Sequence, residues 1–178
     1  MKVLVTAASK HGATYEMAQW IGETIRASGA LVEVARPEEI SSIHDVDVVV
    51  LGSAVYAGHW LAQATTFAQV FRDELRTRTV FLFSSGPVGD PAKPDTEAVD
   101  VDPIRASTDA VEHRTFPGRI DRSSLGFGEK ALVTALRVPA GDFRRRDDIE
   151  SWAREIAAAA RTSEAKGTRG EIAVASGG

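Results

Sequence analysis

The residues best suited to chemistry form a short polar segment near the start of the chain, S-K-H-G-A-T at 9–14, directly after the apolar run K-V-L-V-T-A-A. A helix-like pattern resumes at once behind it. A turn between a strand and a helix exposes backbone N–H groups and the positive end of the helix dipole, which together attract anions. The segment supplies polar side chains, charge and one flexible backbone position for this purpose: Ser9, His11 and Thr14, Lys10, and Gly12. It therefore indicates a phosphate cradle.

The same segment also has a simpler interpretation, because Ser and Thr often do no more than cap a helix. Its spacing fits neither G-x-x-x-x-G-K-[ST] nor G-x-G-x-x-G, so both common nucleotide fingerprints are absent. Anion binding and helix capping therefore stay open for residues 9–14.

Other reaction chemistries find no support in the sequence. The histidines lack H-x-x-x-H spacing and a carboxylate cluster, so no metal site is expected from His11, His44, His59 and His113. Ser85 lacks the G-x-S-x-G context of a hydrolase nucleophile. The chain has no cysteine, which excludes thiolate chemistry and fits a reducing compartment.

Composition narrows the class of protein further. A chain of 178 residues with 43% hydrophobic residues can bury one sizeable core. The formal net charge of -4 argues against nucleic-acid binding, which needs clustered Lys and Arg. No apolar stretch approaches the about 20 residues of a transmembrane helix, and the initial M-K-V-L-V-T is too short for a signal peptide. We expect a cytoplasmic protein without a transmembrane segment.

The elements that must hold the polar segment alternate between strands and helices. Apolar runs, typical of parallel strands covered on both faces, lie at 2–6, 45–53 and 79–85, with a weaker edge strand at 30–35. Amphipathic patterns predict helices between them, one around residues 17–25 that Gly29 ends and one at 61–76. This alternation predicts an open doubly wound α/β sheet with right-handed crossovers.

The second half of the chain is less regular. It contains a proline-rich acidic loop at 86–103, a short helix at 104–111, a last strand at 113–120 that Pro117 limits, and helices at 125–136 and 147–160. We expect one domain over residues 1–161 and a mobile tail over 162–178, where no core-forming pattern is present.

Three segments resemble a known family. S-K-H-G-A-T matches the flavodoxin phosphate-loop pattern [ST]-x-T-G-x-T at Ser9, Gly12 and Thr14, with His11 in place of a Thr. The runs V-V-V-L-G-S-A-V-Y-A-G-H-W and G-D-F-R resemble segments of the flavodoxin-domain family that includes the menaquinone-dependent protoporphyrinogen oxidases. The resemblance extends over about residues 2–160.

The resemblance implies a flavodoxin-like sheet of order 2-1-3-4-5 with FMN at its carboxyl edge, a placement that flavodoxins themselves exemplify. The phosphate would lie on Ser9, Lys10, His11, Gly12, Ala13 and Thr14. The flavin ring would lie between two turns, formed by Ser53, Ala54, Val55, Tyr56, Gly58, His59 and Trp60 and by Ser84, Ser85, Gly86 and Pro87. No catalytic residue and no metal ligand is implied.

Several of these ring contacts have an ordinary structural alternative. Tyr56 and Trp60 could pack beneath a loop, although two aromatics beside Gly58 favour ring contact. The residues 84–86 could simply end a strand. His59 could bond the flavin or serve as a structural histidine.

The sequence also departs from its relatives. The turn S-S-G-P-V-G lacks the aromatic that electron-carrier flavodoxins stack on the ring, which leaves one flavin face open and favours an enzyme. Residues 87–102 are acidic, whereas quinone-linked members carry a basic segment there, so a porphyrinogen substrate is in doubt. Lys10 and His11 make the phosphate loop cationic, which would suit a deazaflavin with an acidic tail.

We therefore expect an FMN-binding redox protein that transfers electrons or oxidises and reduces a small molecule related to quinones or porphyrinogens. Its partner would be a redox protein or that small-molecule substrate. The alternatives are a deazaflavin-binding redox protein and a flavin-free interaction domain of the same fold. The substrate, electron donor and oligomeric state stay open.

Overall fold

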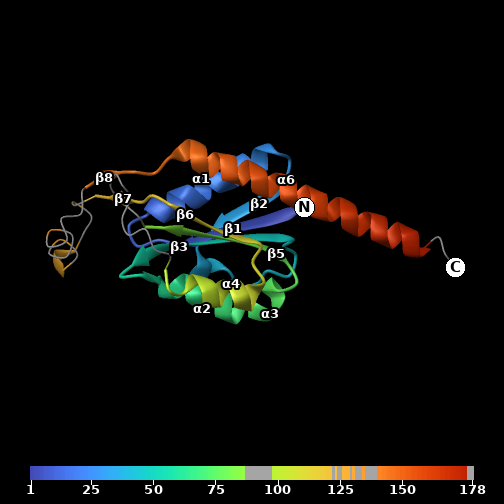
Figure 1. Cartoon of the computed structure of the whole chain (residues 1–178), viewed down its shortest axis with the longest axis horizontal. Helices are drawn as coiled ribbons and strands as arrows, with labels where there is room; N and C mark the ends of the chain where they lie inside the picture. Colours follow the sequence, from blue (N-terminus) through green and yellow to red (C-terminus); the bar gives the residue numbers. More distant parts are fainter. Residues whose placement is uncertain are drawn as a thin grey trace.

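The main sheet is parallel, with strands in the order β2-β1-β3-β5-β6 (Figure 1). The computed structural model describes residues 1–86, 98–121, 123, 126–128, 130, 134 and 140–175, with only the backbone described for 163–175. The strands of the sheet are β1 Lys2–Ala8, β2 Leu31–Ala35, β3 Val48–Tyr56, β5 Thr79–Ser85 and β6 Glu112–Phe116. Short β4, His59–Trp60, pairs antiparallel with the end of β3. The flavodoxin-like order 2-1-3-4-5 is thus confirmed, once the hairpin strand β4 is set aside.

Helices cover both faces of this sheet (Figure 1). On one face lie α1, Ala13–Ala27, and α6, Arg146–Ala175; on the other lie α2, Ala62–Val70, α3, Arg72–Leu75, and α4, Val101–Thr108. A single-turn helix, η1, Pro37–Glu39, follows β2. The central strands are buried almost throughout because both faces meet apolar helix stripes, as their uninterrupted apolar sequences predicted.

The first helix follows its predicted pattern closely. Met17, Ile21 and Ile25 are fully buried against the sheet. Gly29 follows the helix with φ +93° and donates its N–H to the carbonyl of Arg26 at 3.0 Å, as a glycine after a helix end commonly does. The alternation of strands and helices therefore brings the start of α1 directly behind the end of β1.

Two other predicted helices differ in their bounds. The helix predicted at 61–76 is interrupted at Phe71, which has φ -96° and ψ 14°, although Phe71 and Leu75 keep their i to i-4 hydrogen bonds. The helix predicted at 104–111 lies at Val101–Thr108 instead. Its Pro103 is tolerated because the first turn needs no N–H donor there, and Asp109, with φ 51°, ends it.

The last helix is longer than predicted. Helix α6 continues to Ala175, beyond the end near residue 160 that the sequence pattern predicted. In Figure 1 its far part projects beyond the body of the domain. The mobile tail expected over 162–178 stays a prediction. The helix predicted at 125–136 falls largely outside the described residues, and so does most of the acidic loop at 86–103.

A small antiparallel ribbon was not predicted. It consists of β7, Arg119–Ile120, and β8, Gly141–Asp142, with Arg119 opposite Asp142. Pro117 separates β7 from β6, as expected of a proline at the end of an edge strand. The ribbon lies at the end of the molecule opposite the projecting part of α6 (Figure 1).

Candidate active site at the carboxyl edge of the sheet

The predicted phosphate cradle is a tight loop between β1 and α1. Gly12 is the residue that precedes the helix and has φ +84°, in the left-handed region that favours glycine. The hydroxyl of Ser9 accepts a hydrogen bond from the N–H of Thr14 at 3.2 Å, which closes the loop on itself. The side chain of Thr14 is 2% exposed. A Cβ added at Gly12 would meet no atom within 4 Å, so the backbone there faces open space.

Side chains of two neighbouring loops come together beside this cradle. The ring of His11 lies 6.5 Å from the ring of Tyr56, measured between centroids. The Nζ of Lys10 lies 5.6 Å from the centroid of the same tyrosine ring, within the range of a cation–π contact. Tyr56 is 37% exposed, so part of its ring is available to a ligand. The cradle thus continues into an aromatic surface at the end of β3.

The turn that presents Tyr56 is a two-residue hairpin. Ala57 and Gly58 both have positive φ, 49° and 81°, as a type I′ turn requires. The buried hydroxyl of Ser53 accepts the N–H of Leu61 at 2.9 Å and donates to a neighbouring carbonyl, so its hydrogen bonds are used in holding the hairpin. Ala54 and Val55 lie in the last part of β3, buried and half-buried.

Trp60 is oriented into the protein. It is 5% exposed, and its indole N–H donates to the hydroxyl of Ser84 at 2.8 Å. That hydroxyl lies 2.9 Å from Nε2 of His113 on β6. The buried indole of Trp60 thus links β4 to β5 and, through Ser84, to β6. This position favours packing over flavin contact for the side chain.

Asp100 anchors the hairpin from outside. Its Oδ2 accepts the backbone N–H of Trp60 at 2.7 Å and lies 3.2 Å from Nδ1 of His59. The N–H of Val99 donates to the carbonyl of Gly58 at 2.9 Å. The segment before α4 thus holds the turn in place, and His59, although largely exposed, has a carboxylate partner.

The turn after β5 is described only in its first part. Ser84 and Ser85 are buried at the end of the strand, and the N–H of Gly86 donates to the carbonyl of Phe116 at 3.3 Å. Pro87 lies outside the described residues. The ring contacts predicted for 84–87 stay predictions, as do those of the β3 hairpin.

A cluster of opposite charges supports the cradle from the other side. The guanidinium of Arg144, on the segment after β8, donates to the carbonyl of Ala13 at 3.0 Å and to Glu16 at 2.6 Å. It also forms a two-point contact with Asp142, at 2.8 and 2.7 Å. Arg119 reaches the same Glu16 carboxylate at 3.1 Å. The first turn of α1 is therefore tied to the β7–β8 ribbon.

This cluster shifts the acidity of its members. The hydrogen bonds from Arg144 lower the pKa of Asp142 below its ordinary value. The same contact with Asp142 raises the pKa of Arg144 further. Both side chains stay charged at neutral pH. The run G-D-F-R was recognisable in the sequence only as a family resemblance. The contacts of Glu16 with Arg119 and Arg144, and those of Asp100 with the hairpin, join residues far apart in sequence, so no local pattern predicted them.

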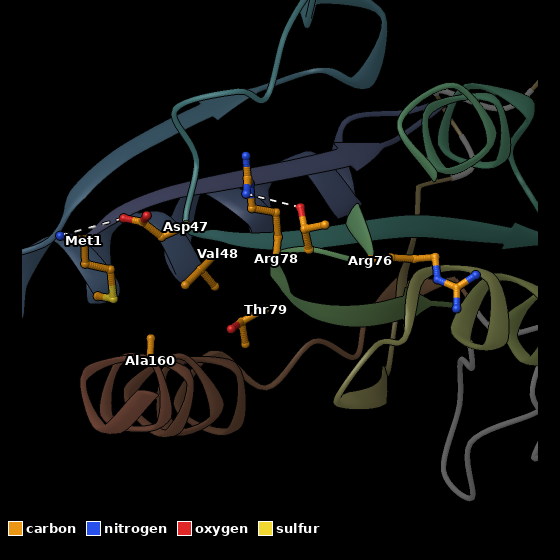
Figure 2. Close-up of a pocket in the computed structure, with 8 residues that line it drawn as sticks. Met1, Asp47, Val48, Arg76, Arg78, Thr79 and Ala160 are labelled. Atoms are coloured by element: carbon orange, nitrogen blue, oxygen red, sulfur yellow. Dashed lines mark hydrogen bonds and ion pairs between the residues drawn. The ribbon is translucent and has the colours of Figure 1, made fainter. Parts of the chain in front are cut away.

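A separate hollow of about 400 Å³ lies at the opposite, amino-terminal edge of the sheet (Figure 2). Its charged groups already contact partners: the N-terminal amine lies 3.9 Å from Asp47, and Arg76 pairs with Asp109. Arg78 donates to Thr77 and to the carbonyl of His44. The buried Nε of Arg78 has no hydrogen-bond partner among the described residues.

Among the described residues, no helix combines the length and apolar character that crossing a bilayer requires. The same residues contain no group of three or more His, Cys, Asp or Glu able to hold a metal ion.

The amino-acid sequence of this chain matches a known protein family. A family model described as "Flavodoxin domain" matches residues 4–147. The chain belongs to the flavodoxin domain family. This flavodoxin-domain protein matches no curated protein in sequence. The finer resemblance to menaquinone-dependent protoporphyrinogen oxidases stays a prediction.

Solved structures of similar fold are distant in sequence. Rubredoxin:oxygen oxidoreductase from Desulfovibrio gigas superposes with a TM-score of 0.65 at 13% identity, covering 90% of this chain and 36% of that one. A flavodoxin from the domain Archaea gives 0.59 at 14% identity, and the Streptococcus pneumonia TIGR4 flavodoxin gives 0.59 at 17%. These cover 90% and 89% of this chain and 99% of each flavodoxin. The flavodoxin-domain protein thus spans about a third of the oxidoreductase and nearly all of the flavodoxins, and the likeness shows the fold.

Proposed function

We propose that this flavodoxin-domain protein binds FMN without covalent attachment at the carboxyl edge of its sheet and works as a redox protein. The observation that carries the proposal is the joining of an anion cradle, Ser9 to Thr14, to the partly exposed ring of Tyr56. A phosphate and a flat aromatic ring are the two ends of FMN. The family match and the flavodoxins among the structures of the same fold support the same cofactor.

The described residues fit such a ligand. The start of the 15-residue helix α1 offers backbone N–H groups and the positive end of its dipole, and Gly12 leaves open space in front of them. Lys10 adds a positive charge beside the cradle. The exposed part of Tyr56 offers a flat surface to the ring, whereas the buried indole of Trp60 holds the hairpin from beneath. The flavin itself supplies one- or two-electron redox chemistry when bound.

The roles of the protein are then to bind and to orient. The cradle fixes the phosphate, and the hairpin, anchored through Asp100, fixes the surface against which the ring lies. Such fixed contacts tune a bound cofactor through stacking and hydrogen bonds. The electrons pass to a redox partner protein or to a small-molecule substrate, for which quinone- and porphyrinogen-related compounds are the candidates.

A second cofactor, a deazaflavin with an acidic tail, is favoured by one further observation. Lys10 and His11 flank the cradle, and Arg36 lies just beyond the carboxyl end of β2, over the ring of Tyr15 at 4.7 Å. The positive charges of Lys10 and Arg36 would attract a ligand more anionic than FMN. Added salt would weaken its binding more than that of FMN, because more of its charges face these cationic groups and salt screens such pairs over about 8 Å at physiological ionic strength.

The deciding experiment is a titration of the apoprotein with FMN, followed by flavin fluorescence, for the parent and two threonine variants. Thr14→Val removes the cradle hydroxyl and keeps the shape of a side chain that is 2% exposed. We expect it to bind FMN at least about ten-fold more weakly, as loss of one charge-assisted hydrogen bond implies. Thr24→Val, on the same helix, removes a hydroxyl that bonds the carbonyl of Trp20 and should leave FMN affinity unchanged.

Each negative result has a distinct meaning. Equal FMN affinity in Thr14→Val and the parent would contradict the cradle assignment. A parent that binds neither FMN nor a deazaflavin would contradict the proposed function and favour a flavin-free interaction domain. A deazaflavin bound more tightly than FMN at physiological salt would replace the first cofactor by the second.

A further inference from the structure

The starting observation is a guanidinium buried beside the cradle. The side chain of Arg144 is only 3% exposed, although it carries a full charge. Its donors reach Asp142, Glu16 and the carbonyl of Ala13, and its guanidinium lies over the ring of Trp20 at 4.7 Å. A buried charge is costly unless it is paired and hydrogen-bonded, and this one is both.

The contacts of Arg144 lie in the first turn of α1, which forms part of the cradle. Ala13 is the first residue of α1, directly after Gly12, and Glu16 follows one turn later. The N–H of Glu16 donates to the carbonyl of Gly12 at 2.9 Å, so Arg144 holds both ends of the first turn of the helix. A fork of planar N–H groups fixes orientation as well as distance.

We propose that Arg144 is a positioning residue for the phosphate cradle: through Ala13 and Glu16 it fixes the first turn of α1 in the geometry that binds a phosphate. The inference rests on the proposed function for the identity of the ligand. All three nitrogens of the Arg144 guanidinium already donate to Asp142, to Glu16 or to the carbonyl of Ala13. Its effect on the ligand is therefore indirect.

Charge balance gives a second reason for the arrangement. The carboxylate of Glu16 stands in the first turn of α1, where it would repel a phosphate bound at the same helix end. Arg119, at 3.1 Å, and Arg144, at 2.6 Å, neutralise it. With Asp142 included, the four charges sum to zero. Loss of Arg144 would leave a net negative charge behind the cradle.

The test compares two ligands that differ only in the phosphate, FMN and riboflavin. Arg144→Met keeps an unbranched apolar side chain against Trp20 and removes the charge and the hydrogen bonds. We expect it to bind FMN about ten-fold or more weakly and riboflavin within about three-fold of the parent, since only FMN uses the cradle. Arg145→Met, an exposed neighbour that pairs with Asp148 at 3.5 Å, is the matched control and should change neither affinity.

A second variant separates position from charge. Asp142→Asn weakens the two-point contact that holds Arg144 and makes the cluster more positive. Charge alone would tighten FMN binding, whereas loss of position weakens it. We expect weaker binding of FMN with unchanged riboflavin affinity. Tighter FMN binding in Asp142→Asn, or equal losses of FMN and riboflavin affinity in Arg144→Met, would overturn the positioning role.

A readout without cofactor keeps the inference independent of the proposed function. Amide hydrogen exchange of the apoprotein should accelerate at Glu16 in Arg144→Met, while Ile21 and Ile25, further along the buried face of α1, keep their protection. Unchanged exchange at Glu16, or uniform acceleration along α1, would overturn the inference even if FMN binds. A parent that fails to bind FMN, with exchange altered at Glu16 alone, would reject the proposed function and retain the local positioning.

Discussion

Substituting Gly12 by Ala should have separate effects on the free energy of unfolding and on FMN affinity. Gly12 has φ +84°, and a Cβ built on it meets nothing within 4 Å. The methyl group of Ala therefore causes no steric clash, and its only cost is backbone strain. For an L-residue the left-handed region costs about 1–2 kcal/mol. The unfolded chain of the Ala variant is less flexible, which returns about 0.4–1 kcal/mol.

The net expectation is a loss of about 1 kcal/mol in the free energy of unfolding, equivalent to about 2–4 °C in Tm for a chain of this size. Gly29 provides a matched control at the other end of the same helix. It has φ +93° and also meets nothing within 4 Å, so Gly29→Ala should cost a similar amount. Urea unfolding of both apoproteins measures these two values.

The two variants should differ in ligand binding. A methyl group at Gly12 stands in the open space where a phosphate must approach the backbone, so FMN affinity should fall by about ten-fold or more, or about 1.4 kcal/mol. Gly29→Ala lies at the far end of α1 and should bind FMN like the parent. Fluorescence titration of FMN measures both.

Two results would refute this reasoning. If Gly12→Ala bound FMN within about two-fold of Gly29→Ala, the phosphate would not approach the backbone at residue 12. If the unfolding cost of Gly12→Ala exceeded that of Gly29→Ala by several kcal/mol, residue 12 would have a structural role that its open surroundings do not show.

Three other outcomes are expected. Tyr56→Ala should restore much of the fluorescence of bound FMN, whereas Trp60→Phe should leave it quenched; the opposite pattern in steady-state emission would place the indole on the ring. Hydrogen bonds from Arg144 lower the pKa of Asp142, so their contribution to the free energy of unfolding is present above the unfolded pKa of about 3.9 and is lost as pH falls through the lower folded value. Urea unfolding at a series of acidic pH values should show this loss in the parent, and Asp142→Asn should lack it. Gly52→Ala should destabilise the apoprotein by about 3 kcal/mol, because its Cβ would enter a buried phenyl ring; a Tm equal to that of the parent would contradict this.

The sequence alone determined the layout of the fold and the place of the polar loop at 9–14. Apolar runs predicted the strands at 2–6, 45–53 and 79–85, because a parallel strand between two helix layers must be apolar on both faces. The small polar break at 9–14 predicted the loop that closes through Ser9, since strand-to-helix turns depend on local residues. Such short-range features can be recognised without knowing what packs against them.

Only the tertiary structure decided what surrounds the cradle. Both aromatics of the β3 hairpin looked equivalent in sequence, yet Tyr56 is partly exposed while Trp60 turns inward, because Ser84 lies within hydrogen-bonding distance of its indole. Arg144 reaches Glu16 across 128 residues of chain. Contacts of this range depend on how the ribbon β7–β8 packs beside α1, and no local sequence pattern predicts that packing. The loop at 9–14 could thus be found from the sequence, and the residues that hold it in position could not.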